Sequence, residues 1–264
     1  MAMNFIRGEF FQQIADGSRI FYSHTHEVAK FLENPPKSQF VLITHNSDGK
    51  ITKNPKRFDS GSSNDIDINK LIIPENLIMW YGQNVDVIHE KIQSIPIGLE
   101  NGVWFQHIQK ENKINSYLVK ETKIKNLLYV CHNINTNPKE RAEPYEIFKN
   151  KNWVTIEHGL NGQNFDRYLE NIHSHKFVLC PEGNGTDTHR TWETLYTGSI
   201  PIEKKNMNNR FYEDLPICFV NSWSDIDENF LEMEYDRIKN KVWNLKKLKM
   251  EYWINKIKKT TYEN

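Results

Sequence analysis

Residues 177–202 read FVLCPEGNGTDTHRTWETLYTGSIPI, in which an apolar run, a glycine-containing loop, a helical pattern and a second apolar run follow one another. The run at 177–180 predicts a buried strand, and the pattern at 188–197 predicts a helix that Gly198 ends. Buried strands separated by helices are typical of a largely parallel sheet. This stretch therefore predicts an α/β fold.

The same alternation continues on both sides and predicts that the second half of the chain is a Rossmann-like unit. Its predicted strands are Asn126–Cys131, Trp153–Glu157, Lys176–Cys180, Ser199–Ile202 and Ile217–Val220. Its predicted helices are Arg141–Lys149, Phe165–Ser174 and Thr188–Thr197. In the first half, strands are predicted at Arg19–Tyr22, Gln39–Thr44, Leu77–Trp80 and Ile92–Ile97, with a helix at His26–Leu32.

A polar stretch, residues 105–125, lies between the halves and is interpreted as a linker because it is dominated by Lys, Asn, Glu and Gln. We predict an N-terminal domain over 1–115, a C-terminal domain over 116–235, and a last segment over 236–264 that packs across both. Apolar residues recur near helical spacing over Tyr235–Lys259, which predicts one long amphipathic helix.

The composition limits the classes of partner. The chain has 34 Lys and Arg residues against 34 Asp and Glu residues, so its overall charge does not favour nucleic acid. No window approaches the roughly 18 apolar residues that cross a bilayer, so we predict a cytoplasmic protein without an integral membrane segment. Three widely spaced cysteines, Cys131, Cys180 and Cys218, predict buried thiols in a reducing compartment.

The loop before the predicted helix at 188–197 has the composition of a phosphate-binding turn. Its glycines let the backbone pass close to a ligand, and one of the polar residues 186–188 is predicted to cap the helix. The first N–H groups of the helix and the positive end of its dipole face such a loop, where an anion binds readily. The candidate binding residues of the loop are Gly183, Asn184, Gly185, Thr186, Asp187 and Thr188.

Arg190 and Glu193 lie three residues apart on that helix and therefore share a face. A guanidinium on this face can bind a diphosphate, while a carboxylate can accept hydrogen bonds from a ribose diol. The same spacing also fits an ordinary strand–loop–helix unit that carries an Arg–Glu pair on its surface.

The run CPEGNGTDTHRTWETLYTGSIPI resembles the donor-binding segment of exostosin-like glycosyltransferases, where G-x-D-x-x-R-x-x-E-x-x-x-x-G-x-I-P-[IV] follows a buried strand. The resemblance implies a GT-B fold, in which two Rossmann-like domains face each other across a cleft and the second holds the donor. It places Arg190 on the pyrophosphate and Glu193 on the ribose. The run LLYVCHN at 127–133 resembles the opening strand of that donor domain, which adds Asn133 and Arg141 as candidate binding residues.

We therefore predict transfer of a sugar from a nucleotide-diphosphate-sugar, with UDP expected rather than GDP, to a hydroxyl of a glycan or glycoconjugate. An inverting, metal-independent transfer needs a general base near the acceptor. The candidates are His45 and Asp48, which follow a predicted strand of the acceptor-binding half, and Glu182 beside the glycine loop. For either His45 or Asp48 alone, a structural turn is the simpler explanation, and a retaining enzyme needs no such base.

Two short motifs are interpreted as structural and not as metal sites. The pair His24-Thr-His26 has no further ligand at convincing spacing, and Asp65-Ile-Asp67 is explained by helix capping. No cofactor other than the sugar nucleotide is predicted. Two other functions stay open: a fucosyltransferase-like GT-B enzyme that uses GDP-fucose, and a non-catalytic protein that binds a nucleotide-sugar or carbohydrate.

Overall fold

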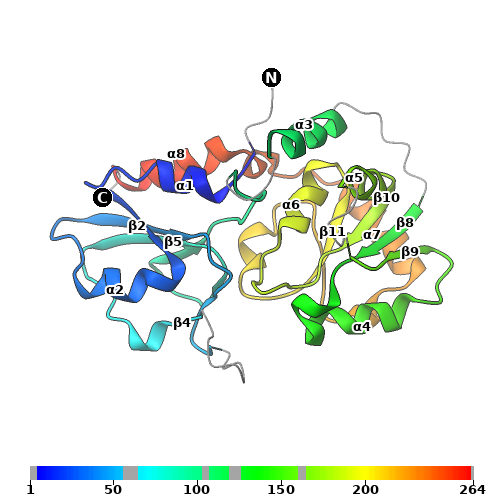
Figure 1. Ribbon diagram of the computed structural model, residues 1–264, viewed down its shortest axis with the longest axis horizontal. Coiled ribbons are helices and arrows are strands. Elements are labelled where there is room, and N and C mark those ends of the chain that lie inside the picture. Colours follow the sequence, from blue (N-terminus) through cyan, green and yellow to red (C-terminus); the bar gives the residue numbers. More distant parts are fainter. Residues whose placement is uncertain (1–4, 56–64, 103–106, 119–125, 160–164, 263–264) are drawn as a thin grey trace.

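The computed structural model describes residues 5–55, 65–102, 107–118, 126–159 and 165–262 of the chain. It is a mixed α/β structure in which one parallel sheet comes from the first half of the chain and another from the second half (Figure 1). The predicted α/β class with largely parallel sheets is therefore confirmed.

The first sheet has the order β1-β2-β5-β7, and all its neighbouring strands are parallel. These strands are β1 (Ile20–His24), β2 (Phe40–His45), β5 (Leu77–Gly82) and β7 (Ile92–Ser94). Helices α1 (Gly8–Gln13) and α8 (Met250–Thr260) lie along one face, and α2 (Val28–Glu33) lies on the other (Figure 1). A small sheet joins β4 (Ile66–Asp67), β3 (Ile51–Thr52) and β6 (Val85–Asp86) in that order.

The second sheet has the order β12-β11-β10-β8-β9, again with parallel pairs. Its strands are β8 (Asn126–Cys131), β9 (Val154–Glu157), β10 (His175–Leu179), β11 (Ile200–Lys204) and β12 (Cys218–Val220). In this sheet β9 lies on one side of β8, and β10, the next strand along the chain, lies on the other side of β8. In such sheets a crevice opens outside the carboxyl ends of the two strands at which the direction of winding changes, here β8 and β10.

Four helices cover the two faces of the second sheet: α4 (Pro138–Phe148), α5 (Phe165–His173), α6 (His189–Tyr196) and α7 (Glu228–Lys239). Residues of β8 alternate between these faces, as a buried strand requires. Tyr129 and Cys131 pack in the cluster that contains α5 and α6 residues, whereas Leu128 and Val130 pack in the cluster that contains α4 and α7 residues. This arrangement is consistent with the predicted Rossmann-like half.

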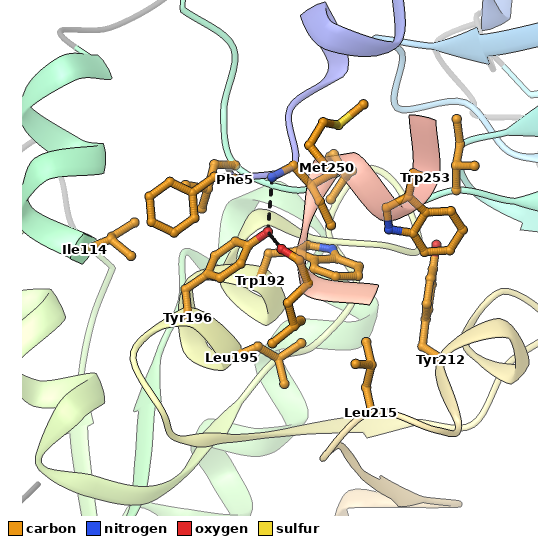
Figure 2. Close-up of a cluster of buried hydrophobic side chains, with 14 of the residues drawn as sticks. Phe5, Ile114, Trp192, Leu195, Tyr196, Tyr212, Leu215, Met250 and Trp253 are labelled. Carbon is orange, nitrogen blue, oxygen red and sulfur yellow. Dashed lines mark hydrogen bonds between the residues drawn. The ribbon is translucent and has the colours of Figure 1, made fainter. Parts of the chain in front are cut away.

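One buried apolar cluster is continuous from the first sheet to the second. It includes Val41 of β2, Val178 of β10 and Trp253 of α8, all fully buried. The Tyr196 hydroxyl accepts a hydrogen bond from the Ile6 amide at 3.1 Å and donates one to the Leu248 carbonyl at 2.9 Å (Figure 2). The N-terminal segment, α6 and the segment before α8 therefore meet at one buried point.

Short 3₁₀ helices complete the chain: η1 (Thr25–Glu27), η2 (Ile68–Lys70), η3 (Ile134–Thr136), η4 (Asn209–Tyr212), η5 (Trp223–Asp225) and η6 (Leu245–Leu248). The Asp67 side chain accepts a hydrogen bond from the Asn69 amide at the start of η2, which confirms the capping interpretation for that residue. All three cysteines are buried and free, as predicted. Within the described residues, no helix combines the length and the apolar character that crossing a membrane requires.

The stretch predicted as a linker, 105–125, contains a helix that was not predicted, α3 (His107–Leu118). Ile114 of this helix is buried, and the Tyr117 ring contacts the His173 ring with centroids 4.9 Å apart. Polar composition concealed the helix because few apolar residues suffice to attach it to α5 and α6. Residues 105–106 and 119–125 of the predicted linker lie outside the described residues.

The prediction of a single helix over Tyr235–Lys259 is wrong. α7 ends at Lys239 and α8 begins at Met250, and the indole N–H of Trp243 donates to the Ile238 carbonyl at the end of α7. Helix α7 packs on the second sheet and α8 on the first, so the chain must turn between them. Val242, one of the apolar residues within the predicted helix, is 95% exposed in that turn.

Candidate functional site

A cavity of about 490 Å³ lies at the carboxyl ends of β8 and β10. This is the position that the strand order of the second sheet favours for a ligand. The loops after β8 and β10 supply half of its lining residues. Helix α4 supplies Arg141, α5 supplies Tyr168, and α6 supplies His189, Arg190 and Glu193. The lining residues are Asp48, Ile97, Asn133, Thr136, Arg141, Tyr168, Gly183, Asn184, Gly185, Asp187, Thr188, His189, Arg190 and Glu193.

Arg190 projects from the first turn of α6 into this cavity. Its Nε atom is buried and has no hydrogen-bond partner, and no ion pair joins its guanidinium to a carboxylate of the described residues. Its guanidinium carbon lies 5.8 Å from the centroid of the Tyr168 ring. A buried guanidinium nitrogen without an acceptor is costly, so Arg190 is the strongest indication that this cavity binds an anion.

Arg141 of α4 approaches the cavity from the opposite side of the second sheet. It is 7% exposed, and it donates from Nε to the Glu182 carbonyl at 2.9 Å and from Nη1 to the Asn133 carbonyl at 3.1 Å. Burial, followed by the charge of Arg190, lowers the pKa of Arg141 to about 10. The two guanidinium groups thus repel each other across the cavity, and the acceptors that hold Arg141 are uncharged.

The carboxylates around the cavity are bonded to neutral donors. Glu193 accepts a hydrogen bond from the Tyr168 hydroxyl at 2.8 Å. Asp187 accepts from the Ile97 amide and from the Trp192 indole, each at 2.8 Å, and burial raises its pKa to about 6. These carboxylates therefore leave the positive charge of the arginines available to a ligand.

The prediction that a side chain of 186–188 caps α6 is wrong. Thr188 occupies the capping position without a side-chain hydrogen bond to the helix backbone. Asp187 is directed to Ile97 and Trp192, and the Thr186 hydroxyl is buried without a partner and does not line the cavity. The first turn of α6 therefore keeps amide groups without a side-chain cap at the cavity wall.

Neighbouring side chains leave no room for a Cβ atom at the two loop glycines, Gly183 and Gly185. A Cβ atom at Gly183 would lie 2.8 Å from Nη2 of Arg141, and one at Gly185 would lie 2.5 Å from Nδ2 of Asn84. Asn84 has φ 56° and is fully buried. Its side chain accepts from the Asp187 amide at 2.9 Å and donates to the Asp48 carbonyl at 3.2 Å. Asn84 thus joins the first half of the chain to the glycine loop.

Of the three predicted bases, only Asp48 is well placed. It is exposed at the cavity, where its carboxylate accepts from the Asn184 amide at 3.1 Å. Glu182 does not line the cavity, because it forms an ion pair with Lys50 at 2.9 Å.

His45 has no free ring nitrogen. Its Nε2–H donates to the Pro96 carbonyl at 3.0 Å, and its Nδ1 accepts from the Asn46 amide at 2.8 Å. Burial lowers its pKa to about 4. This geometry favours a structural role for His45 at the end of β2.

A second cavity of about 380 Å³ adjoins the first. It lies at the carboxyl ends of β2 and β5, and side-chain amides, hydroxyls and carboxylates dominate its lining. The lining residues are His45, Asn46, Ser47, Asp48, Gln83, Ile97, Glu100, Asn101 and His189.

Comparison with known protein-family models gives no match, and no curated protein sequence matches the chain significantly.

Sequence reasoning did not select Tyr168, His189, Thr136, Ile97 or Asn84, which line or shape the cavities. Tyr168 lies on the buried face of α5, where the pattern indicates only core packing. His189 precedes Arg190 and was visible in the sequence, but its hydrogen bond to the distant Gly98 carbonyl was not. Among the described residues, no group of three or more His, Cys, Asp or Glu side chains is placed to hold a metal ion.

Proposed function

We propose that this protein is a glycosyltransferase that binds a nucleotide-diphosphate-sugar in the 490 Å³ cavity and transfers the sugar to a hydroxyl acceptor. The observation that carries the proposal is the pair of guanidinium groups of Arg141, which is buried, and Arg190, which is half-buried with a buried, unpartnered Nε. Both face one cavity without a carboxylate partner among the described residues.

A diphosphate meets the requirements of this pair. Its oxygens supply acceptors for Arg190 and for the remaining N–H groups of Arg141, and its negative charge relieves their repulsion. The uncapped first turn of α6 adds amide donors and the positive end of the helix dipole. The same groups stabilise the diphosphate as it leaves the sugar, when its charge increases.

Glu193 is proposed to accept hydrogen bonds from the ribose hydroxyls. One carboxylate oxygen is held by the Tyr168 hydroxyl at 2.8 Å, which orients the other toward the cavity that both residues line. With the donor on the second sheet, the neighbouring 380 Å³ cavity on the first sheet is left for a glycan or glycoconjugate acceptor.

This assignment corresponds to a GT-B arrangement with domain boundaries near 115 and 235. In it, the C-terminal segment crosses back from the second domain and packs on the first sheet. We propose an inverting, metal-independent reaction and a UDP-sugar in preference to a GDP-sugar. The three free, buried cysteines support a reducing, cytoplasmic location.

The test is thermal unfolding of the wild type, Arg190→Ala and Arg237→Ala with UDP, GDP, CMP and their sugar conjugates. Arg237 is the matched control because it pairs with Glu234 on α7 and does not line the cavity. A nucleotide at 100 times its Kd should raise the free energy of unfolding by about 2.7 kcal/mol. Arg190→Ala should bind about 10- to 100-fold more weakly, because a charge-assisted hydrogen bond is lost.

Equal nucleotide binding by wild type and Arg190→Ala would contradict the donor site, as would no stabilisation of the wild type by any nucleotide. Stabilisation by GDP-fucose alone would instead indicate the fucosyltransferase-like alternative. Binding without sugar transfer or hydrolysis would indicate a non-catalytic binding protein.

A further inference from the structure

His189 lies at the boundary between the two cavities. It is the first residue of α6, directly before Arg190, and it lines both the 490 Å³ and the 380 Å³ cavity. Only Asp48 and Ile97 share this position among the described lining residues. A group at this boundary can reach an acceptor in one cavity and a donor sugar in the other.

The surroundings of His189 select one tautomer of its ring. Nδ1 lies 2.7 Å from the Gly98 carbonyl oxygen, which can only accept, so Nδ1 carries the proton. In the neutral ring Nε2 is then an acceptor, and Nε2 has no hydrogen-bond partner among the described residues. The Gly98 carbonyl, in the first half of the chain, thus orients the free Nε2 of His189 in the second half.

The 380 Å³ cavity has a lining that suits a sugar. Asn101 donates to Asn46 at 2.7 Å, and Gln83 accepts from the Asn46 amide at 3.1 Å, so these amides are held in place. In small-molecule sites a few precisely placed polar groups fix the orientation of the ligand. The hydroxyls of a sugar can bond with amides held in this way.

On these observations we propose that His189 is the general base of the transfer and that its Nε2 takes the proton of an acceptor sugar hydroxyl bound in the 380 Å³ cavity. This inference rests on the proposed function. The acceptor oxygen forms the new bond to the anomeric carbon, and the bond from that carbon to the diphosphate oxygen breaks. The electron pair leaves with the diphosphate, held by Arg190, and the proton stays on His189 until solvent removes it.

His189 is better placed for this role than either residue of the first half. His45 has both ring nitrogens bonded, and its Nε2 faces the Pro96 carbonyl. The Asp48 carboxylate is exposed, and its hydrogen-bond partner is the side-chain amide of Asn184, whereas a backbone carbonyl orients His189.

The charged and titratable groups that face His189 come from several elements. Asp187 precedes it on the loop, and Asp48 and Glu100 line the acceptor cavity; Arg141, Arg190 and Glu193 line the donor cavity, and His45 lies at the end of β2. An imidazole base stops acting when it is protonated, so kcat/KM of the wild type should fall on the acid side of its pH profile.

His189→Asn is the informative substitution, because its amide can still donate to the Gly98 carbonyl while the Nε2 position is removed. His26→Asn is the matched control on an exposed histidine outside both cavities. UDP affinity is measured from thermal stabilisation. Turnover is measured as UDP release from UDP-glucose, UDP-galactose, UDP-N-acetylglucosamine and UDP-xylose, with methyl glycosides or water as acceptor.

We expect His189→Asn to keep UDP affinity within about threefold and to lose about 10²- to 10⁴-fold in kcat, together with the acid limb of the pH profile. His26→Asn should match the wild type. Turnover and a pH profile like those of the wild type in His189→Asn would overturn the inference and leave the proposed function intact. A comparable loss in Asp48→Asn alone would assign the base to Asp48, whereas a wild type that neither binds nor turns over these donors would remove both proposals.

Discussion

Glu203 carries a carboxyl group into the core behind the candidate site. It lies on β11, is 9% exposed, and accepts a hydrogen bond from the Thr191 hydroxyl of α6 at 2.5 Å. Burial raises its pKa to about 8, and the charge of Asp187 acts in the same direction. The folded protein therefore retains a proton here that the unfolded chain, with an ordinary carboxyl pKa near 4.5, releases.

This proton makes stability fall as pH rises from about 4.5 toward 8, with a slope of about 1.4 kcal/mol per pH unit from this group. Glu203→Gln has no proton to release, so we expect it to unfold at higher urea concentration than the wild type at pH 8. The difference should shrink as the pH is lowered to 5. Urea unfolding at pH 5, 6.5 and 8 measures it, with the exposed Glu90→Gln as control. A difference that does not change with pH would contradict the assignment.

The candidate site could be predicted in part from single residues. Gly183, Arg190 and Glu193 were found because they are close in sequence, and the structure places them around one cavity together with Arg141. His45 shows the limit of this reasoning. A histidine after a strand has the same sequence signature whether its ring is free or bonded on both nitrogens, and the bond to the Pro96 carbonyl comes from a different loop.

Among the elements, α6 has two roles. Its first turn carries His189 and Arg190 at the cavities, and its last residue, Tyr196, bonds the Ile6 amide and the Leu248 carbonyl inside the core (Figure 2). The orientation of the site thus depends on a buried contact at the other end of the same helix.

Tyr196→Phe leaves both backbone groups buried without their partner. We expect the free energy of unfolding to fall by about 1–3 kcal/mol, since an unsatisfied buried polar group loses its solvation without compensation. Chemical denaturation measures the change, and Tyr262→Phe serves as control because Tyr262 is 79% exposed. If the two variants were equally stable, the Tyr196 hydroxyl would not hold these segments together.

A helix or strand could be predicted from the sequence where its apolar pattern lies within one short stretch of the chain. The predicted bounds of β8 match the observed ones. β7 ends three residues before the predicted Ile97, which lines the cavities beyond the end of the strand. The polar α3 and the break between α7 and α8 were not predictable, because both depend on which distant surface each helix contacts.

The two sheets share one core. Phe5 and Trp253 pack with residues of both sheets in a single buried cluster, and the ion pair between Lys50 and Glu182 joins the halves beside the cavity. Helix α8, from the end of the chain, supplies part of the cover of the first sheet (Figure 1).

We therefore expect the protein to unfold in a single cooperative transition, with calorimetric and van't Hoff enthalpies that agree. The isolated fragment 1–115 should not unfold cooperatively, because it lacks the fully buried side chains of α8, Met250, Trp253 and Ile257. Scanning calorimetry of the full chain and circular dichroism of the fragment test this. Two separate transitions, or a cooperatively folded fragment, would show that the halves are independent.

Local patterns in the sequence were sufficient for the α/β class, most strands of both sheets and the loop and helix that carry Arg190, because hydrophobic periodicity and helix signals act between residues near in the chain. The contacts between the two halves of the chain could be found only from the tertiary structure. Asn84 against Gly185, His189 against the Gly98 carbonyl and Arg141 beside Arg190 each join distant segments. Such pairs are set by how the two sheets and α8 pack, and no periodicity along the chain encodes that packing directly.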